Sequence, residues 1–316
     1  MNNILSPGEK FFQEVRKTTF RKEEFEYIHT GIIDEDGESW TTTELDEANI
    51  FQVYNQYRVT HGIPFPDEII AIRKHYGISA AKMSQILGFG INQYRLYEEG
   101  EVPSISNART IIASTQKDIF LSFLEASKNE MKDSEYHKIK NKIESTESYM
   151  APKGKITEIS GYRSLSLGKI EAVVHKIIST IGPTFVTKMN KLLFYIDFIN
   201  YKRHGYGITG LTYRALQFGP VPDSWAKTYG SLKDLCMNEY VYPSGQSGIL
   251  LDNISKKDSY VLSDQELKTV DDVCQLFSKL TAGEISEISH KEKGWIENAP
   301  THSEISYQKA FELNYD

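Results

Sequence analysis

The chain has 316 residues, of which 40% are hydrophobic and 25% are charged, and its net charge is −7. This length predicts two folded units, and the composition excludes a collagen-like, low-complexity or largely disordered chain. Apolar runs are too short for a membrane-spanning helix and the first residues lack the pattern of a secretory signal, so we expect a cytoplasmic protein.

The cysteine count and the net charge exclude further classes. Cys236 and Cys274 are the only cysteines, so the sequence predicts neither a disulfide framework nor a four-cysteine zinc site. An acidic chain offers no general attraction for nucleic acid, so DNA binding requires a local basic patch.

Residues 1–63 form an acidic segment that we expect to repel DNA. Ten Asp or Glu residues lie within 23–47, with no Lys or Arg among them. The β-prone side chains on both sides of Asp36-Gly37 predict a small hairpin. Apolar residues spaced by three and four predict a helix over 46–60.

Residues 64–127 contain short helical segments separated by glycines. Apolar positions predict helices over 69–76, 80–87 and 91–98, and a fourth helix follows at about 105. The residues expected to cap or end these helices are Gly77, Ser79, Gly88, Gly100 and Ser104.

Short helices in this arrangement are typical of a helix-turn-helix, in which the first helix braces the second in a major groove. We expect Ile91, Tyr94 and Tyr97 to face inward on the 91–98 helix. Amide side chains can pair with adenine and Arg with guanine, so the outward side chains suit base reading. The predicted DNA-binding residues are Ser79, Lys82, Asn92, Gln93, Arg95 and Leu96.

Charge supports the same hypothesis, because residues 69–97 carry four Lys or Arg and no Asp or Glu. The alternative is a helical packing unit with a solvated basic side.

At the centre of 69–103, the motif Gly90-Ile91-Asn92-Gln93-Tyr94-Arg95-Leu96-Tyr97-Glu98-Glu99-Gly100 resembles the DNA-binding domain of MqsA-type antitoxins in the Xre helix-turn-helix family.

This resemblance implies that Asn92 reads a base. The family's nearby Arg is matched by Leu96, with Arg95 beside it. The family often carries an N-terminal zinc module, but residues 1–63 contain no Cys. That module is therefore either degenerate here or replaced by a zinc-free fold.

Residues 128–161 are rich in Lys, Glu and Ser and predict a charged linker, compatible with a solvated helix over 130–146. Beyond a boundary near residue 155, periodicity returns. The elements expected there are helices over 168–181 and 185–201, a strand over 208–218, a hairpin over 240–254 around Ser244-Gly245, and helices over 264–279 and 284–295.

A second resemblance covers about 165–315. The residues that carry it are Lys191-Leu192-Leu193-Phe194-Tyr195, Asp197, Tyr201, Gly205, Gly210, Tyr213, Ala215, Gly219-Pro220-Val221-Pro222, Ser289-His290 and Trp295. This pattern resembles the SocA-like, or Panacea, domain. The resemblance implies an antitoxin that neutralises the toxin of a neighbouring gene by direct binding.

We expect toxin contact on a surface around the 219–222 elbow, where two prolines fix the backbone. The alternative is that the elbow only sets the geometry of the fold. The candidate toxin-binding residues are Tyr195, Asp197, Tyr213, Phe218, Gly219, Pro220 and Pro222.

No catalytic, metal or cofactor site is expected. His175, His204 and His290 are isolated, and the sequence has neither a Gly-rich phosphate loop nor paired histidines at i and i+4. We therefore predict a protein that is not an enzyme.

Together these features predict a fold that is mainly α with small β elements (α+β), with a helix-turn-helix domain at 64–127 and an α+β Panacea-like domain at 162–316. The predicted function is an antitoxin of a type II toxin–antitoxin system, whose partners are a cognate toxin and operator DNA, bound as a homodimer. The alternatives are a stand-alone transcriptional regulator with a ligand-sensing or dimerising C-terminal domain, and a proteolysis adaptor.

Overall fold

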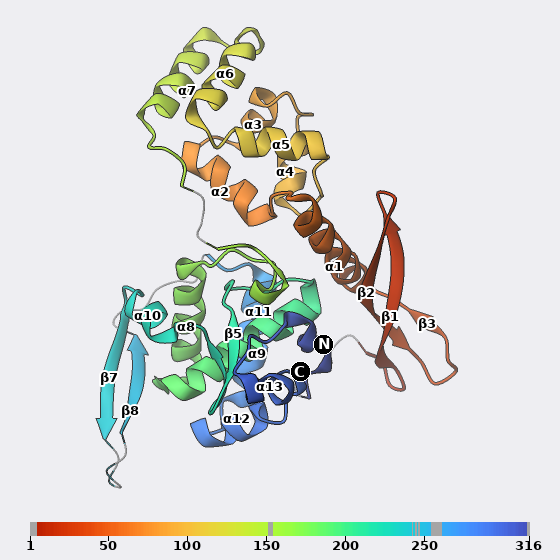
Figure 1. The fold of residues 1–316 in the computed structure, drawn as a ribbon, viewed down its shortest axis with the longest axis vertical. Coiled ribbons are helices and arrows are strands. Elements are labelled where there is room, and N and C mark those ends of the chain that lie inside the picture. The colour runs from red at the N-terminus through yellow and green to blue at the C-terminus, as the bar shows by residue number, and fades with distance from the viewer. Residues whose placement is uncertain are drawn as a thin grey trace. The chain divides into compact units, whose positions relative to one another are not determined.

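The computed structural model describes residues 5–150, 154–241, 243, 245, 247–253 and 261–314 (Figure 1). The described chain is mainly helical with small antiparallel sheets, which confirms the predicted fold class. It divides into two compact units, Met1–Gln52 with Lys155–Asp316, and Val53–Gly154. The four-part division expected from the sequence has different boundaries, after residues 63, 127 and 161, and stays a prediction.

The first unit begins with a three-stranded antiparallel sheet of β1 (Lys10–Phe20), β2 (Glu23–Ile33) and β3 (Ser39–Trp40). The predicted reversal at Gly37 joins β2 to β3, where the φ angle of Gly37 is +86°. The longer β1–β2 hairpin was not anticipated. Its two-residue turn is Arg21-Lys22, with φ of 49° and 73°, instead of the Asn-Gly or Asp-Gly pair that marks such turns in a sequence.

Helix α1 (Thr43–His61) confirms the predicted helix and completes the edge of β2 where β3 stops. The Asn49 amide accepts from the backbone N–H of Thr30 at 2.9 Å and donates to its carbonyl at 3.0 Å. One turn later, Gln52 makes the same pair of bonds with Ile28, at 3.1 and 2.9 Å. Two side-chain amides therefore take the place of a neighbouring strand.

The second unit is helical. Its elements are α2 (Pro66–Tyr76), α3 (Ala80–Ile86), α4 (Gln93–Glu98), α5 (Ile105–Ala113), α6 (Lys117–Ala126) and α7 (Asp133–Ser145). Ser79 and Ser104 cap α3 and α5 by accepting from the N–H three residues later, as predicted. Gly77 ends α2 in a left-handed conformation, φ +60°, which glycine adopts without steric cost.

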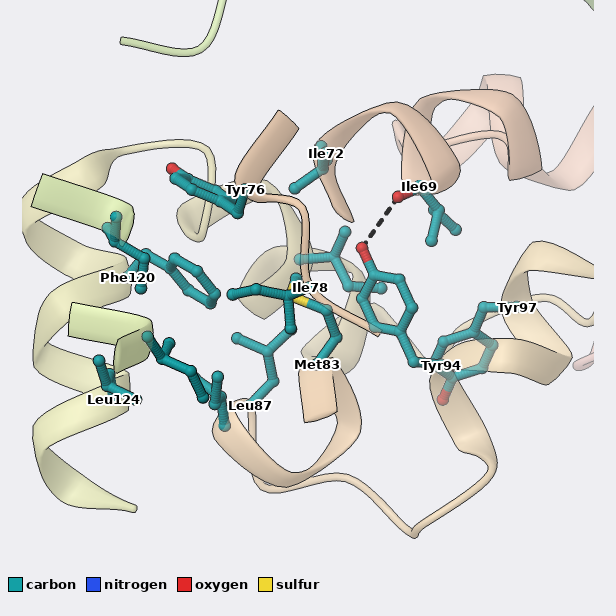
Figure 2. Close-up of a cluster of buried hydrophobic side chains, with 14 of the residues drawn as sticks. Ile69, Ile72, Tyr76, Ile78, Met83, Leu87, Tyr94, Tyr97, Phe120 and Leu124 are labelled. Carbon is teal, nitrogen blue, oxygen red and sulfur yellow. Dashed lines mark hydrogen bonds between the residues drawn. The ribbon is translucent and has the colours of Figure 1, made fainter. Parts of the chain in front are cut away.

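These helices share one core (Figure 2). Tyr94 is fully buried in it, and its hydroxyl donates to the carbonyl of Ile69 at 2.9 Å. The helix expected to be solvated within 130–146 is instead packed along one face, because Tyr136, Ile139 and Ile143 of α7 belong to the same core.

The remaining elements of the first unit surround one central helix. They are α8 (Leu167–Ile181), β4 (Thr184–Phe185), α9 (Val186–His204), β5 (Tyr213–Leu216), β6 (Gly219–Pro222), α10 (Trp225–Gly230), β7 (Leu235–Val241), β8 (Ser247–Asn253), α11 (Asp264–Phe277), α12 (Ala282–Ser289) and α13 (Lys293–Asn298). Helix α9 is buried on nearly every side from Val186 to Tyr201. It contacts α8, α11, α12 and β6, so the core of this unit is built around it.

Two predictions for this region need correction. The strand expected over 208–218 is restricted to β5, because residues 208–212 bend around a buried carboxylate described below. The single helix expected over 284–295 is two helices, α12 and α13, separated at 290–292. The predicted hairpin is present as β7 and β8, with a longer first arm, while Ser244 and Ile254 lie outside the described residues.

Because the amide side chains of Asn49 and Gln52 replace a neighbouring strand, removing one of them should lower the stability of the protein. Gln52→Leu leaves the N–H and carbonyl of Ile28 without their protein partners, so we expect the free energy of unfolding to fall by about 2 kcal/mol. Gln265→Leu, the same change at an exposed position of α11, should alter it by less than about 0.5 kcal/mol. Equal effects of the two substitutions in urea unfolding would contradict this role for Gln52.

Candidate functional site

The first candidate site is the α3–α4 pair. Gly88, with φ of +71°, lies in the connection between the two helices. The Ser84 hydroxyl accepts from the backbone N–H of Tyr94 at 3.0 Å, and both Tyr94 and Tyr97 are buried. The start and the inner face of α4 are therefore fixed by the core of the unit.

The outer face of α4 carries several of the predicted DNA-binding residues. Asn92, Arg95 and Leu96 are exposed, and the Asn92 side chain makes no capping bond to α4. Ile91 was expected to point inward but is 76% exposed. It precedes the first turn of α4, so the helical periodicity used to predict its burial does not apply to it.

The basic patch expected over 69–97 is largely neutralised, which corrects the prediction from charge. Glu98 binds Arg73 through two bonds, at 2.5 and 3.1 Å, and raises the pKa of that guanidinium. Lys82 pairs with Glu135 of α7 at 2.8 Å, and Arg95 lies 3.8 Å from Glu99. The acidic partners lie outside the sequence window that was counted.

The two other predicted DNA-binding residues are also engaged. Gln93 is half-buried and donates to the Glu101 carboxylate at 2.9 Å. Ser79 is exposed, but its hydroxyl accepts from the N–H of Lys82 at 3.3 Å. Asn92 and Arg95 therefore remain the polar side chains of this set with the greatest freedom to contact a ligand.

The second candidate site is centred on Asp197 of α9, whose side chain is fully buried. Its carboxylate accepts from the backbone N–H groups of Ile208 and Thr209, at 2.7 and 2.9 Å, and from the hydroxyl of Tyr213 at 2.6 Å. The Thr209 hydroxyl also donates to it. Burial raises the pKa of the Asp197 carboxyl, and these donors act in the opposite direction.

A second buried polar group of α9 contacts the 219–222 elbow. The Lys191 ammonium donates to the carbonyl of Pro220 at 2.9 Å, and burial lowers the pKa of Lys191 to about 7. Gly219 has φ of +99°, and a Cβ there would overlap the side chains of both Lys191 and Ser289. Close packing explains why this position of the elbow requires glycine.

These contacts correct the expected placement of the toxin-binding residues. Tyr195, Asp197 and Tyr213 are fully buried, and Gly219, Pro220 and Pro222 are buried in β6. In this structure they support the domain from within and form no surface. Phe218 differs, because it lies between β5 and β6 and is 64% exposed.

One buried acid of this region was not singled out from the sequence. Glu292 is 1% exposed and accepts from the Tyr195 hydroxyl at 2.9 Å, although the two residues are 97 positions apart. No local pattern indicates such a pair.

Among the described residues, no group of three or more His, Cys, Asp and Glu side chains is placed to hold a metal ion. None of the described helices is long and apolar enough to cross a bilayer.

Comparison with known proteins gives one match. Residues 189–296 match the family model of the antitoxin SocA-like, Panacea domain. This segment runs from α9 to α13 and contains both Asp197 and the elbow, and the match confirms the expected resemblance there. The helix-turn-helix assignment of 69–103 stays a prediction. No curated protein and no solved structure gives a significant match.

The lowered pKa of Lys191 predicts how stability depends on pH. Unfolded chains keep the lysine proton up to a pKa of 10.5, whereas the folded state releases it near 7. The unfolded state therefore binds more protons between these values, and stability rises with pH there. Methionine does not titrate, so Lys191→Met loses this pH-dependent contribution to stability. We expect the unfolding free energy of the wild type, minus that of Lys191→Met, to rise from about pH 7 to about pH 9, by up to about 1.4 kcal/mol per pH unit.

The same substitution at the exposed Lys291 is the matched control and should track the wild type across this range. Chemical unfolding at a series of pH values measures all three proteins. A constant difference between the wild type and Lys191→Met would show that Lys191 releases no proton on folding in this range.

Proposed function

We propose that this protein is an antitoxin of a type II toxin–antitoxin system. The observation that carries the proposal is the match of residues 189–296 to a family model described as an antitoxin domain. In this proposal, the domain built around α9 binds and neutralises a protein toxin encoded by an adjacent gene. The direct test is co-expression with that neighbouring gene, which should be toxic alone and tolerated with this protein.

The α3–α4 pair supplies the second part of the proposal, which is repression of the protein's own operon. It is supported by two short helices joined through Gly88, with the second anchored by buried tyrosines and exposing Asn92 and Arg95. Because most nearby cations are paired, we propose that base contacts contribute more than a basic field. A single small module of this kind has limited affinity, so it acts as a homodimer on a palindromic operator.

Operator binding tests the role of α4. Asn92→Ala and Arg95→Ala should each weaken specific binding to the promoter of the operon by about 1–3 kcal/mol, since each removes hydrogen bonds to a base edge. Asn141→Ala, on the exposed side of α7, is the matched control for loss of an amide and should bind normally. Wild-type affinity and footprint for both α4 variants in a mobility-shift titration would remove this helix from base reading.

We place the toxin contact at the exposed turn between β5 and β6. Phe218 presents a large apolar side chain there, and the flanking strands are held firmly, since Lys191 binds the Pro220 carbonyl and the Trp295 indole donates to the Leu216 carbonyl at 2.8 Å. Ile296 of α13 is also exposed, at 53%, and α13 contacts β5. An exposed aromatic ring on a rigid support is typical of an interface anchor, because little entropy is lost when it is buried.

Replacing this aromatic side chain tests the proposed toxin surface. Phe218→Ala should weaken toxin binding by about tenfold or more and reduce rescue from toxicity, without lowering the melting temperature. Leu276→Ala, at an exposed apolar position of α11, should bind and rescue normally. Full rescue and unchanged affinity for Phe218→Ala would show that the toxin binds elsewhere.

A further inference from the structure

A cavity of about 460 Å³ opens on the N-terminal sheet of the first unit. One face of β1 and β2 lines it together with β3, the following loop and the first turns of α1. Phe12, Tyr27 and Trp40 contribute aromatic rings to its wall. This size lies within the range of small-molecule sites, and aromatic walls favour a flat, apolar ligand body. Neither the sequence motifs nor the proposed function uses this cavity.

His29 provides a hydrogen-bond donor in the same cavity. His29 as a whole residue is 7% exposed, and its Nδ1 lies 3.1 Å from Nδ2 of Asn49. The two bonds of the Asn49 amide to the backbone of Thr30 fix which amide atom is the nitrogen. Nδ2 therefore donates to Nδ1, and the proton of the neutral ring is on Nε2.

The Nε2–H group has no partner among the residues that the structure describes, and His29 lines the cavity. Burial of the ring lowers the pKa of His29, as does the charge of Arg16, so the neutral ring predominates near pH 7. Because His29 lines the cavity, its Nε2–H group can donate to an acceptor on a bound ligand.

The charges around the cavity define the ligand further. Arg16 lines it but is bound to Glu14 at 2.6 Å, and Asp46 contributes a carboxylate to the wall. The cavity therefore has no excess positive charge, and it lies within an acidic segment. Polyphosphates and nucleic acid strands are disfavoured in such surroundings. A neutral planar ring that accepts from His29 and donates to Asp46 fits better.

We propose that this cavity binds the base of a purine nucleoside, with guanosine preferred. Guanine has acceptors at O6 and N7 for the donor of His29, and N–H groups at N1 and N2 for the carboxylate of Asp46. Its flat ring suits the walls formed by Phe12, Tyr27 and Trp40. The cavity volume leaves room for the ribose. This inference is independent of the proposed antitoxin function.

The test is a titration of the full-length protein with guanosine, followed by calorimetry and by the intrinsic fluorescence of its three tryptophans. We expect one saturable site below about 1 mM, with a fluorescence change that is lost in Trp40→Phe. Adenosine, which lacks the N1–H donor, should bind more weakly. Tryptophanamide serves as a flat aromatic probe without the purine edge and should bind more weakly still.

Two variants assign the polar contacts. His29→Phe keeps a ring but removes the donor, and Asp46→Asn removes the acceptor charge at an exposed position; each should weaken guanosine binding about tenfold or more. Asp36→Asn, outside the cavity lining, is the control and should bind normally. If His29→Phe melts early, Asp46→Asn decides the assignment.

Three results would overturn the proposal: no saturable binding of guanosine at about 1 mM, unchanged affinity in folded Asp46→Asn, or tryptophanamide binding as tightly as guanosine. The last result would mean a general aromatic pocket that does not read the purine edge.

Discussion

The buried carboxylate of Asp197 is the constraint on which the domain around α9 depends. Two of its donors are backbone N–H groups, at Ile208 and Thr209, and these cannot reverse their role. The chain leaving α9 is therefore bent back onto that helix before it enters β5. The position of β5 sets that of β6, which places the Pro220 carbonyl at the Lys191 ammonium. Two polar groups of one helix thus determine the path of the elbow.

The same region shows what sequence patterns predict and where they fail. Helix ends marked by Ser79, Gly77 and Ser104 were predicted because caps are local, within three residues of the groups they satisfy. The polar residues of α9 were placed on a surface because a helix usually turns such residues to solvent. Here their partners are distant in the chain, as with Tyr195 and Glu292, and no local signal reveals them.

Charge failed as a predictor for a related reason. A count over 69–97 includes Arg73 and Lys82 but not the carboxylates that neutralise them, which lie on α4 just beyond the window and on α7. The α7 segment itself was expected to be a charged linker, because its polar residues outnumber three well-spaced apolar ones. Those three are sufficient to pack it against the neighbouring helices. This packing brings Glu135 of α7 next to Lys82 of α3, whose charge it offsets.

The amide pairs of Asn49 and Gln52 also affect how the N-terminal sheet meets other chains. An open strand edge invites pairing with a strand from another molecule, which is a common route to aggregation. On one side β2 is closed first by β3 and then by α1. The opposite edge of the sheet is β1, which carries Glu14, Arg16 and Lys17, and charged side chains oppose strand addition. Both features disfavour the addition of a fourth strand, so we expect this hairpin to resist edge-to-edge association with the sheets of other molecules.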